Sequence, residues 1–279
     1  MEGQVDRLVQ KTWKKFQELP RSKRWLIAVS GIPGSGTTSP SPYPPPPSSI
    51  YQPQLTSRDP GKTTLAAQVA QRLNALHADH NPALANSAIA TFLPMDGYHL
   101  TRAQLSAMPD PHTAHARRGA AFTFDAPAFL ALVKKLREPL CPETGTVFAP
   151  SFDHAVKDPK AEDIAIPATS RVVVMEGNYL SLGSGVEEWK EAAELMDELW
   201  FVEVEFKVAR ERLVKRHVAS GIARDEEEAG RRADENDLVN GREIVEGRLE
   251  VDEVVVSRED GAWAPERQGI ERERDSVVA

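Results

Sequence analysis

Gly31-Ile32-Pro33-Gly34-Ser35-Gly36 and Gly61-Lys62-Thr63-Thr64 are two stretches of this chain that together decide its fold. Joined, they read GIPGSGKTT, which satisfies the P-loop pattern G-x-x-x-x-G-K-[ST]. In such a loop the glycine amides wrap phosphates, the lysine reaches the β and γ oxygens, and the next hydroxyl holds Mg²⁺. The pattern therefore predicts these nucleotide-binding residues: Gly31, Gly34, Ser35, Gly36, Gly61, Lys62, Thr63 and Thr64.

The residues on either side of this pattern are those that a P-loop requires. Residues 25–30 form a short apolar run that ends at a glycine, which is typical of a buried parallel strand. After the lysine, Leu65, Val69, Leu73 and Leu76 recur at helical spacing. A helix that opens at this point would add its dipole and its free N–H groups to anion binding.

Residues 37–61 separate the two halves and read TTSPSPYPPPPSSIYQPQLTSRDPG. They show no hydrophobic periodicity, and the four prolines at 44–47 favour polyproline II, so we expect a disordered insertion. An excursion just before the lysine conflicts with a tight phosphate loop. Two hypotheses stay open. The segment is a translated intron, whose removal restores a single glycine before Lys62, or it is a real insertion that carries a ligand for SH3- or WW-type partners.

Length and composition indicate one α/β domain. The 279 residues, 41% of them hydrophobic, suffice for one large core, which we expect over residues 24–258 with a charged flexible tail at 259–279. The net charge of −8 argues against a nucleic-acid partner, because binding to a phosphate backbone depends on a basic surface. The single cysteine, Cys141, excludes a disulfide framework and a cysteine metal site.

The first 23 residues predict an amphipathic helix that packs on the core. Apolar residues occupy one face of residues 5–19, and Pro20 ends the pattern. A mitochondrial presequence is the alternative, although the acidic residues Glu2, Asp6 and Glu18 count against it. Because the chain contains neither an apolar run of membrane-spanning length nor a signal-peptide core, we expect no membrane partner and a cytoplasmic location.

Further strands are predicted at 88–95, 171–175, 199–204 and 251–256, with helices between several of them. This alternation predicts a Rossmann-like parallel β-sheet flanked by helices, whose ligands bind beyond the carboxyl ends of the strands. Asp96 and Glu176 follow two of these strands, so we expect both near the P-loop. A basic helix at about 207–218 is either a charged solvated face or, in a phosphotransferase, a helical lid that closes arginines over the γ-phosphate.

Phosphoryl transfer depends on positioning the reactants and on neutralising the charge of the phosphates, and each candidate catalytic residue has one of these two tasks. Lys62 would bridge phosphate oxygens, while Thr63 and Glu176 would hold Mg²⁺. Asp96 would orient the acceptor hydroxyl or take its proton. The alternatives are a simple strand-end carboxylate for Glu176 and a turn residue for Asp96.

Other polar residues in the loops are candidates for binding the substrate. His99 follows Asp96, although a lone histidine is as often structural. Asp125 is either a substrate ligand or the N-cap of a helix at 126–136. The candidate set for the acceptor is Asp96, His99, Arg117, Arg118, Asp125, Asp153 and His154, of which the last two belong to a region that reads as a loop.

With the join restored, five segments occur in an order that resembles the phosphoribulokinase/uridine kinase family of P-loop kinases. They are GIPGSGKTT, MDGYHL at 95–100, RRGAAFTFD at 117–125, PSFDH at 150–154 and VVVMEGNYL at 172–180. The resemblance covers roughly residues 24–256. It implies that Asp96 activates the acceptor hydroxyl, that Glu176 is the acid of the family's E-G motif, and that Arg216 is a lid arginine that reaches the nucleotide.

The resemblance leaves the acceptor open. The segment at 117–125 is similar to the R-K-G-F-P-E-S-Y-D stretch of bacterial-type pantothenate kinases but departs at Ala120, Ala121 and Phe122. The segment at 152–154 is similar to the Y-D-x-x-x-H segment of uridine kinases, with different spacing. Proteins similar to nicotinamide riboside kinase are a third match.

Two functional hypotheses follow. The first is an ATP- and Mg²⁺-dependent kinase that phosphorylates a hydroxyl of a small metabolite, such as a nucleoside, a pantothenate-like acid or a sugar. Whether this kinase forms a homodimer stays open. The second is a catalytically impaired nucleotide-binding regulatory or interaction protein, in which the proline-rich insertion binds partners.

Overall fold

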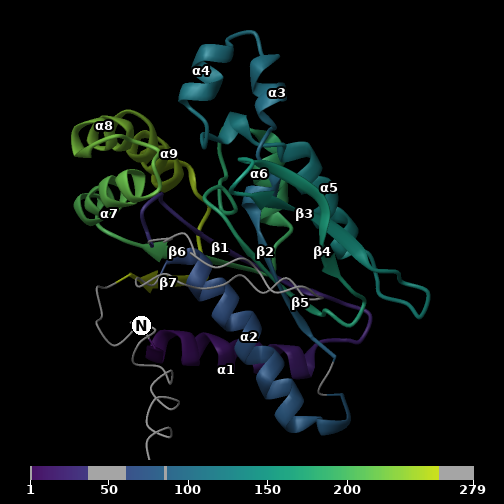
Figure 1. Cartoon of the computed structure of the whole chain (residues 1–279). Helices are drawn as coiled ribbons and strands as arrows, with labels where there is room; N and C mark the ends of the chain where they lie inside the picture. The colour runs from purple at the N-terminus through teal and green to yellow at the C-terminus, as the bar shows by residue number, and fades with distance from the viewer. Residues whose placement is uncertain (1, 37–60, 85–86, 258–279) are drawn as a thin grey trace, which may run out of the picture.

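The computed structural model describes residues 2–36, 61–84 and 87–257 (Figure 1). Its centre is a five-stranded sheet in the order β2-β5-β1-β6-β7, and every neighbouring pair is parallel. The strands are β1 (Trp25–Gly31), β2 (Ala90–Pro94), β5 (Val172–Glu176), β6 (Glu198–Glu203) and β7 (Glu253–Val256). The predicted parallel α/β fold is confirmed.

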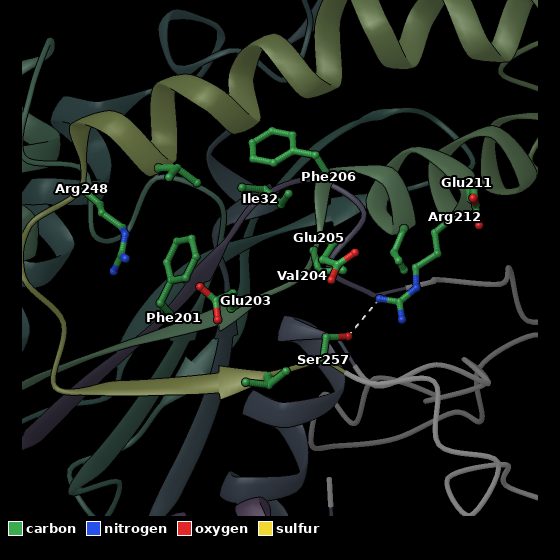
Figure 2. Close-up of a pocket in the computed structure, with 13 residues that line it drawn as sticks. Ile32, Phe201, Glu203, Val204, Glu205, Phe206, Glu211, Arg212, Arg248 and Ser257 are labelled. Atoms are coloured by element: carbon green, nitrogen blue, oxygen red, sulfur yellow. Dashed lines mark hydrogen bonds between the residues drawn. The ribbon is translucent and has the colours of Figure 1, made fainter.

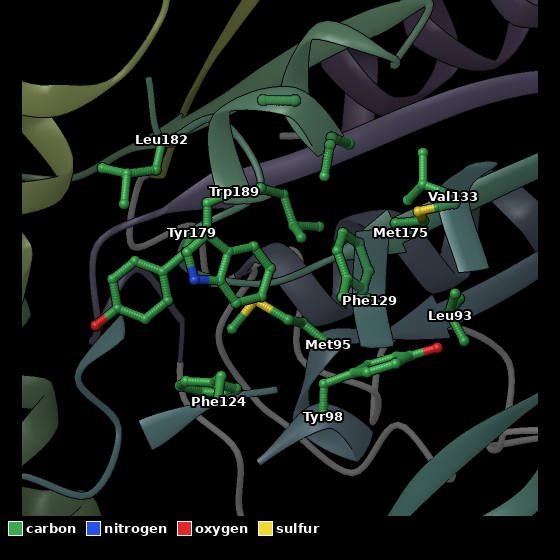
Figure 3. Close-up of a cluster of buried hydrophobic side chains, with 14 of the residues drawn as sticks. Leu93, Met95, Tyr98, Phe124, Phe129, Val133, Met175, Tyr179, Leu182 and Trp189 are labelled. Carbon is green, nitrogen blue, oxygen red and sulfur yellow. The ribbon is translucent and has the colours of Figure 1, made fainter. Parts of the chain in front are cut away.

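Both faces of the sheet are covered, which explains the uninterrupted apolar runs in its central strands. Leu26 and Ala28 of β1 face one buried cluster, whereas Ile27 and Val29 face a second. The first cluster includes helices α5 (Ala126–Arg137) and α6 (Glu187–Glu194), and its aromatic centre contains Phe124, Phe129, Tyr179 and Trp189 (Figure 3). The second cluster is covered by α1 (Glu2–Glu18) and α2 (Lys62–His80).

Helix α1 belongs to the core, as its amphipathic pattern predicts. Val5 and Leu8 are fully buried, and the helix packs along α2 and the edge strand β7. Lys11 Nζ lies 2.8 Å from Glu198 Oε2 and 2.8 Å from Glu253 Oε1, so the helix also joins the two strands at this edge.

The prediction of a loop around residues 150–154 is wrong. These residues belong to an antiparallel hairpin of β3 (Val147–Asp153) and β4 (Asp158–Ile166). A register shift between Ala149 and Ser151 accommodates Pro150. Because proline interrupts a ladder and the strands carry many polar residues, the alternation that marks a strand is absent from the sequence.

The described helices continue with η1 (Pro82–Leu84), η2 (Met95–Tyr98), α3 (Arg102–Ser106), α4 (Pro111–Ala116) and η3 (Ala121–Thr123). We use the name lid for α7 (Phe206–Ala219), α8 (Glu226–Arg232), the π-helical segment η4 (Ala233–Asp237) and α9 (Leu238–Gly247). Helices α7, α8 and α9 gather on one side of the sheet, away from the β3–β4 hairpin (Figure 1). Among the residues that the structure describes, no helix is both long and apolar enough to cross a membrane.

Candidate active site

The first half of the P-loop lies at the carboxyl end of β1, where two positions accept only glycine. Gly34 has φ +81°, and a Cβ at this position would lie 2.6 Å from the Ala209 carbonyl oxygen of α7. A Cβ on Gly31 would lie 2.6 Å from the Val202 carbonyl oxygen. The absence of side chains thus lets the loop pack directly against β6 and α7.

The two halves of the pattern meet at their glycines. A Cβ on Gly36 would lie 2.2 Å from the Gly61 Cα, and a Cβ on Gly61 would lie 2.4 Å from the Gly36 Cα. Backbones this close leave room for no side chain, so glycine is required on both sides of the junction. Gly61 is also the N-cap of α2, and its lack of a side chain leaves the first N–H groups of that helix available to a phosphate. The predicted insertion at 37–61 lies outside the described residues except for Gly61.

Lys62 is the first residue of α2 and turns back under the loop. Its Nζ donates to the Ile32 carbonyl oxygen and to Ser35 Oγ, both at 3.1 Å. Burial lowers the pKa of Lys62 to about 8, although the carboxylates of Glu176 and Asp96 oppose this change. The lysine therefore lies within the electrostatic reach of both strand-end acids.

Glu176 ends β5 and faces the start of α2. The Thr63 hydroxyl donates to Glu176 Oε2 at 3.0 Å, and the glutamate is 9% exposed. Burial raises the pKa of Glu176 to about 7, with Lys62 opposing and Asp96 adding to the change. A hydroxyl and a carboxylate at this separation are hard oxygen ligands of the kind that Mg²⁺ prefers, so these residues fit the metal predicted for them.

Asp96 lies in η2, directly after β2, and its side chain is 51% exposed. His99 Nδ1 lies 3.0 Å from the Asp96 carbonyl oxygen. The imidazole lies between two aromatic rings, with centroid distances of 4.0 Å to Phe124 and 5.0 Å to Phe152. Burial lowers the pKa of His99, so the ring is neutral at pH 7. Asp96 thus stands at the open side of the site, next to an aromatic wall.

Arg216 of the lid helix α7 interacts electrostatically with the same site. Burial lowers the pKa of Arg216, and three charged neighbours act on it, namely Asp237, Asp96 and Arg232. Arg216 therefore lies within reach of the same strand-end acid as Lys62. Arg232 lies at the end of α8, and no motif in the sequence distinguishes it from the other arginines nearby.

Arg212, one helical turn before Arg216, ties the lid to the P-loop. It is 3% exposed, and its Nη1 donates to Ser257 Oγ at 2.9 Å, while Ser257 Oγ donates to the Ser35 carbonyl oxygen at 3.1 Å (Figure 2). Arg212 and Ser257 line a cavity of about 740 Å³ beside Ile32 of the loop. No motif singled out Ser257, because it reaches the loop only through the pairing of β7 with β6.

The remaining predicted substrate ligands have partners within the protein. Asp125 Oδ1 accepts from the Ala128 N–H and caps α5, and Asp153 Oδ1 accepts from two N–H groups in the β3–β4 turn. Arg118 Nη2 donates to the Leu100 carbonyl oxygen and to Asp158. His154 is exposed and packs against Phe152. Arg117 is directed into the lid.

The loop, the two strand-end acids and the arginine-bearing lid define a P-loop kinase. No protein-family model matches the chain. The ATP-dependent kinase-like protein notR' of Aspergillus versicolor is 58% identical over 161 residues, which are 58% of this chain and 92% of that protein. The uridine kinase-like protein C227.14 of Schizosaccharomyces pombe is 37% identical over 222 residues, 80% of this chain and 78% of that protein.

A comparison with solved structures gives the same fold. YFH7 of Saccharomyces cerevisiae, whose crystal structure is described as a P-loop kinase with a circular permutation, superposes with a TM-score of 0.72 at 23% identity, covering 92% of this chain and 99% of that one. The chain belongs to the family of uridine kinase-like P-loop kinases.

Proposed function

We propose that this protein transfers the γ-phosphate of ATP to a hydroxyl group of a small metabolite. The observation that carries the proposal is the convergence of Lys62, Thr63 and Glu176 where the two halves of the P-loop meet, with Asp96 acting on the same charges. The printed names of the relatives, an ATP-dependent kinase-like protein and a uridine kinase-like protein, support the same reaction class.

The residues of the loop have the chemistry for phosphate binding. The Lys62 ammonium would exchange its bonds to Ile32 and Ser35 for phosphate oxygens, and the amides at the start of α2 would complete the cradle. Thr63 and Glu176 would hold Mg²⁺, which neutralises phosphate charge when bound. Arg216 supplies a further positive charge from the lid.

The cavity beside Arg212 is suited to the base of the nucleotide. It adjoins the P-loop at Ile32, and its lining combines apolar side chains such as Phe206 with the Arg212 guanidinium. A planar guanidinium stacks well on an aromatic ring. The Nε and Nη2 atoms of Arg212 are buried and have no hydrogen-bond partner among the described residues, so a ligand or a shift of the side chain would have to satisfy them.

On the acceptor side, Asp96 would accept the hydroxyl proton or orient the hydroxyl for in-line attack. The aromatic wall formed by His99, Phe124 and Phe152 limits the space next to it. Nucleosides, pantothenate-like acids and sugars remain the candidate acceptors.

The experiment is a panel of these metabolites incubated with Mg·ATP and the variant that lacks residues 37–61. Production of ADP above the background, together with a phosphorylated product, supports the proposal and identifies the acceptor. The same variant with Lys62→Ala is the control and should be inactive. Turnover that survives this substitution would refute the assignment.

A further inference from the structure

Among the residues that the structure describes, the Arg117 guanidinium has its polar contacts with the lid. Its Nε donates to Asn236 Oδ1 at 2.9 Å, and its Nη2 donates to Asn240 Oδ1 at 2.7 Å. Glu243 Oε1 lies 3.9 Å from the same Nη2. Two nitrogens of the guanidinium thus bind asparagines that are one helical turn apart, Asn236 in η4 and Asn240 in α9.

The two asparagines are held firmly in place. Asn236 is 4% exposed and Asn240 is 1% exposed, so their side-chain oxygens need a donor from within the protein. Asn236 belongs to the π-helical segment, and such segments are frequent at functional sites. Its neighbour Asp237 lies 2.9 Å from His217 Nε2, and His217 follows Arg216 in α7. On the lid side, Arg117 thus binds Asn236, whose neighbour Asp237 contacts His217 beside Arg216. Arg216 is the arginine on which the charge of Asp96 acts.

On its other side, Arg117 belongs to the loop of residues 117–123, which we call the acceptor loop because it packs on the residues after Asp96. Leu100 N donates to the Thr123 carbonyl oxygen at 2.9 Å, and Arg118 Nη2 donates to the Leu100 carbonyl oxygen at 3.1 Å. The Tyr179 hydroxyl donates to the Gly119 carbonyl oxygen at 2.7 Å and anchors the loop to the segment that follows β5.

We propose that Arg117 is a positioning residue that fixes the acceptor loop and the lid relative to each other. Its guanidinium joins the acceptor loop, which packs on Leu100 after Asp96 and His99, to the segment of η4 and α9 on the lid side. Asn236 Nδ2 donates to the Arg118 carbonyl oxygen at 3.4 Å and adds a further contact between the same two sides. Closing the lid over the nucleotide would then also set the acceptor side. This inference rests on the proposed function, because it assigns the two sides to acceptor and nucleotide.

Amide hydrogen exchange of the full chain tests this link. Arg117→Met removes the fork but keeps much of the side-chain length, and it should speed exchange about tenfold in both the acceptor loop and residues 233–247. Arg210→Met is the matched control, since Arg210 binds Asp234 within the lid through two contacts of 2.7 Å. The control should speed exchange in the lid alone.

A second variant approaches the link from the lid side. Asn240→Ala should speed exchange in the acceptor loop to a smaller extent, because it removes one of the two bonds of the guanidinium. Combining it with Arg117→Met should add little, because Arg117→Met already removes the bond to Asn240. Exchange in β1 and β5 reports whether each variant is folded. If Arg117→Met unfolds the protein, Asn240→Ala alone decides. A change confined to the element that carries the substitution would overturn the proposal.

The non-hydrolysable analogue AMP-PNP, added with Mg²⁺, separates positioning from simple stabilisation. In the unsubstituted chain the analogue should slow exchange in the acceptor loop as well as in the lid, whereas in Arg117→Met only the lid should respond. Equal slowing of the loop in both proteins would contradict the link. Failure of the analogue to protect any segment both in the full chain and in the variant that lacks residues 37–61 would count against the proposed function, while the nucleotide-free comparison would still decide the role of Arg117.

Discussion

Lys62 and Glu176 place a positive and a negative charge in one buried site, and this pairing governs the chemistry at the scale of single residues. Each loses solvation on burial, and each opposes that effect in the other. The pKa of the glutamate rises to about 7 while that of the lysine falls to about 8. Burial thus favours the neutral form of both groups, and the charge of each group stabilises the charged form of the other.

We predict a bell-shaped pH dependence of Mg·ATP affinity in the variant that lacks residues 37–61. Affinity should rise as Glu176 loses its proton near pH 7 and fall as Lys62 loses its proton above pH 8. Isothermal titration calorimetry at several pH values measures this. In Glu176→Gln the rise on the acid side should vanish while the fall on the alkaline side persists. An unchanged acid limb would show that another group titrates there.

Asp96 should act on the acceptor rather than on the nucleotide. Replacing its carboxylate by an amide in Asp96→Asn removes the proton acceptor, so kcat should fall by about 10²- to 10⁴-fold. Because its side chain is half exposed and hydrogen-bonds no phosphate-loop residue among those described, the Kd for ATP should change little. Steady-state kinetics with the acceptor from the panel, combined with ATP titration, separates the two effects. A parallel loss of ATP binding would contradict this role.

Sequence reasoning succeeds for residues whose neighbours in space follow from a motif. The meeting of Thr63 with Glu176 was predictable, because parallel strands end at one edge of the sheet and the P-loop lies at that edge. The roles of Thr63 and Glu176 in holding Mg²⁺ stay predictions. The partners of Arg117 were not predictable: Asn236 and Asn240 are more than a hundred residues away and carry no motif. The N-cap role of Asp125 was one of the two alternatives, and the structure shows that cap.

At the scale of elements, helix α1 should be needed for stability. In Lys11→Met the buried Glu198 loses the ammonium 2.8 Å from its Oε2, and among the described residues the Trp200 indole is the side-chain donor that remains to it. The free energy of unfolding should therefore fall by about 2 kcal/mol. Arg7→Met is the control: this residue is half exposed and pairs with Glu253, so its loss should cost less than about 1 kcal/mol. Urea unfolding followed by circular dichroism measures both. Equal effects would mean that Glu198 does not depend on Lys11.

The elements also show where periodicity is informative. Apolar runs located β1, β2, β5, β6 and β7 to within about two residues, and helical spacing located α1, α2, α5 and α7. The β3–β4 hairpin escaped prediction because Pro150 and the polar residues of β4 hide its alternation. The π-helical segment in the lid has no pattern of its own in the sequence.

At the scale of the whole molecule, the ends of the interruption lie in contact. The junction of Gly36 with Gly61 means that removing residues 37–61 requires no rearrangement of β1 or α2. Closing a loop of 25 residues costs about 3 kcal/mol of free energy, taken as (3/2)RT ln n. The shortened protein should therefore unfold at a higher urea concentration than the full chain. Lower stability would indicate that the segment contributes contacts to the fold.

The central claim is that two separated stretches make one phosphate-binding loop, and ATP binding tests it most directly. Calorimetry should compare the full chain, the variant that lacks residues 37–61, and that variant with Lys62→Ala. We predict that the shortened protein binds Mg·ATP, that Lys62→Ala abolishes this binding, and that the full chain binds more weakly. A shortened, folded protein that binds no ATP, or that binds it equally well without Lys62, would contradict the account.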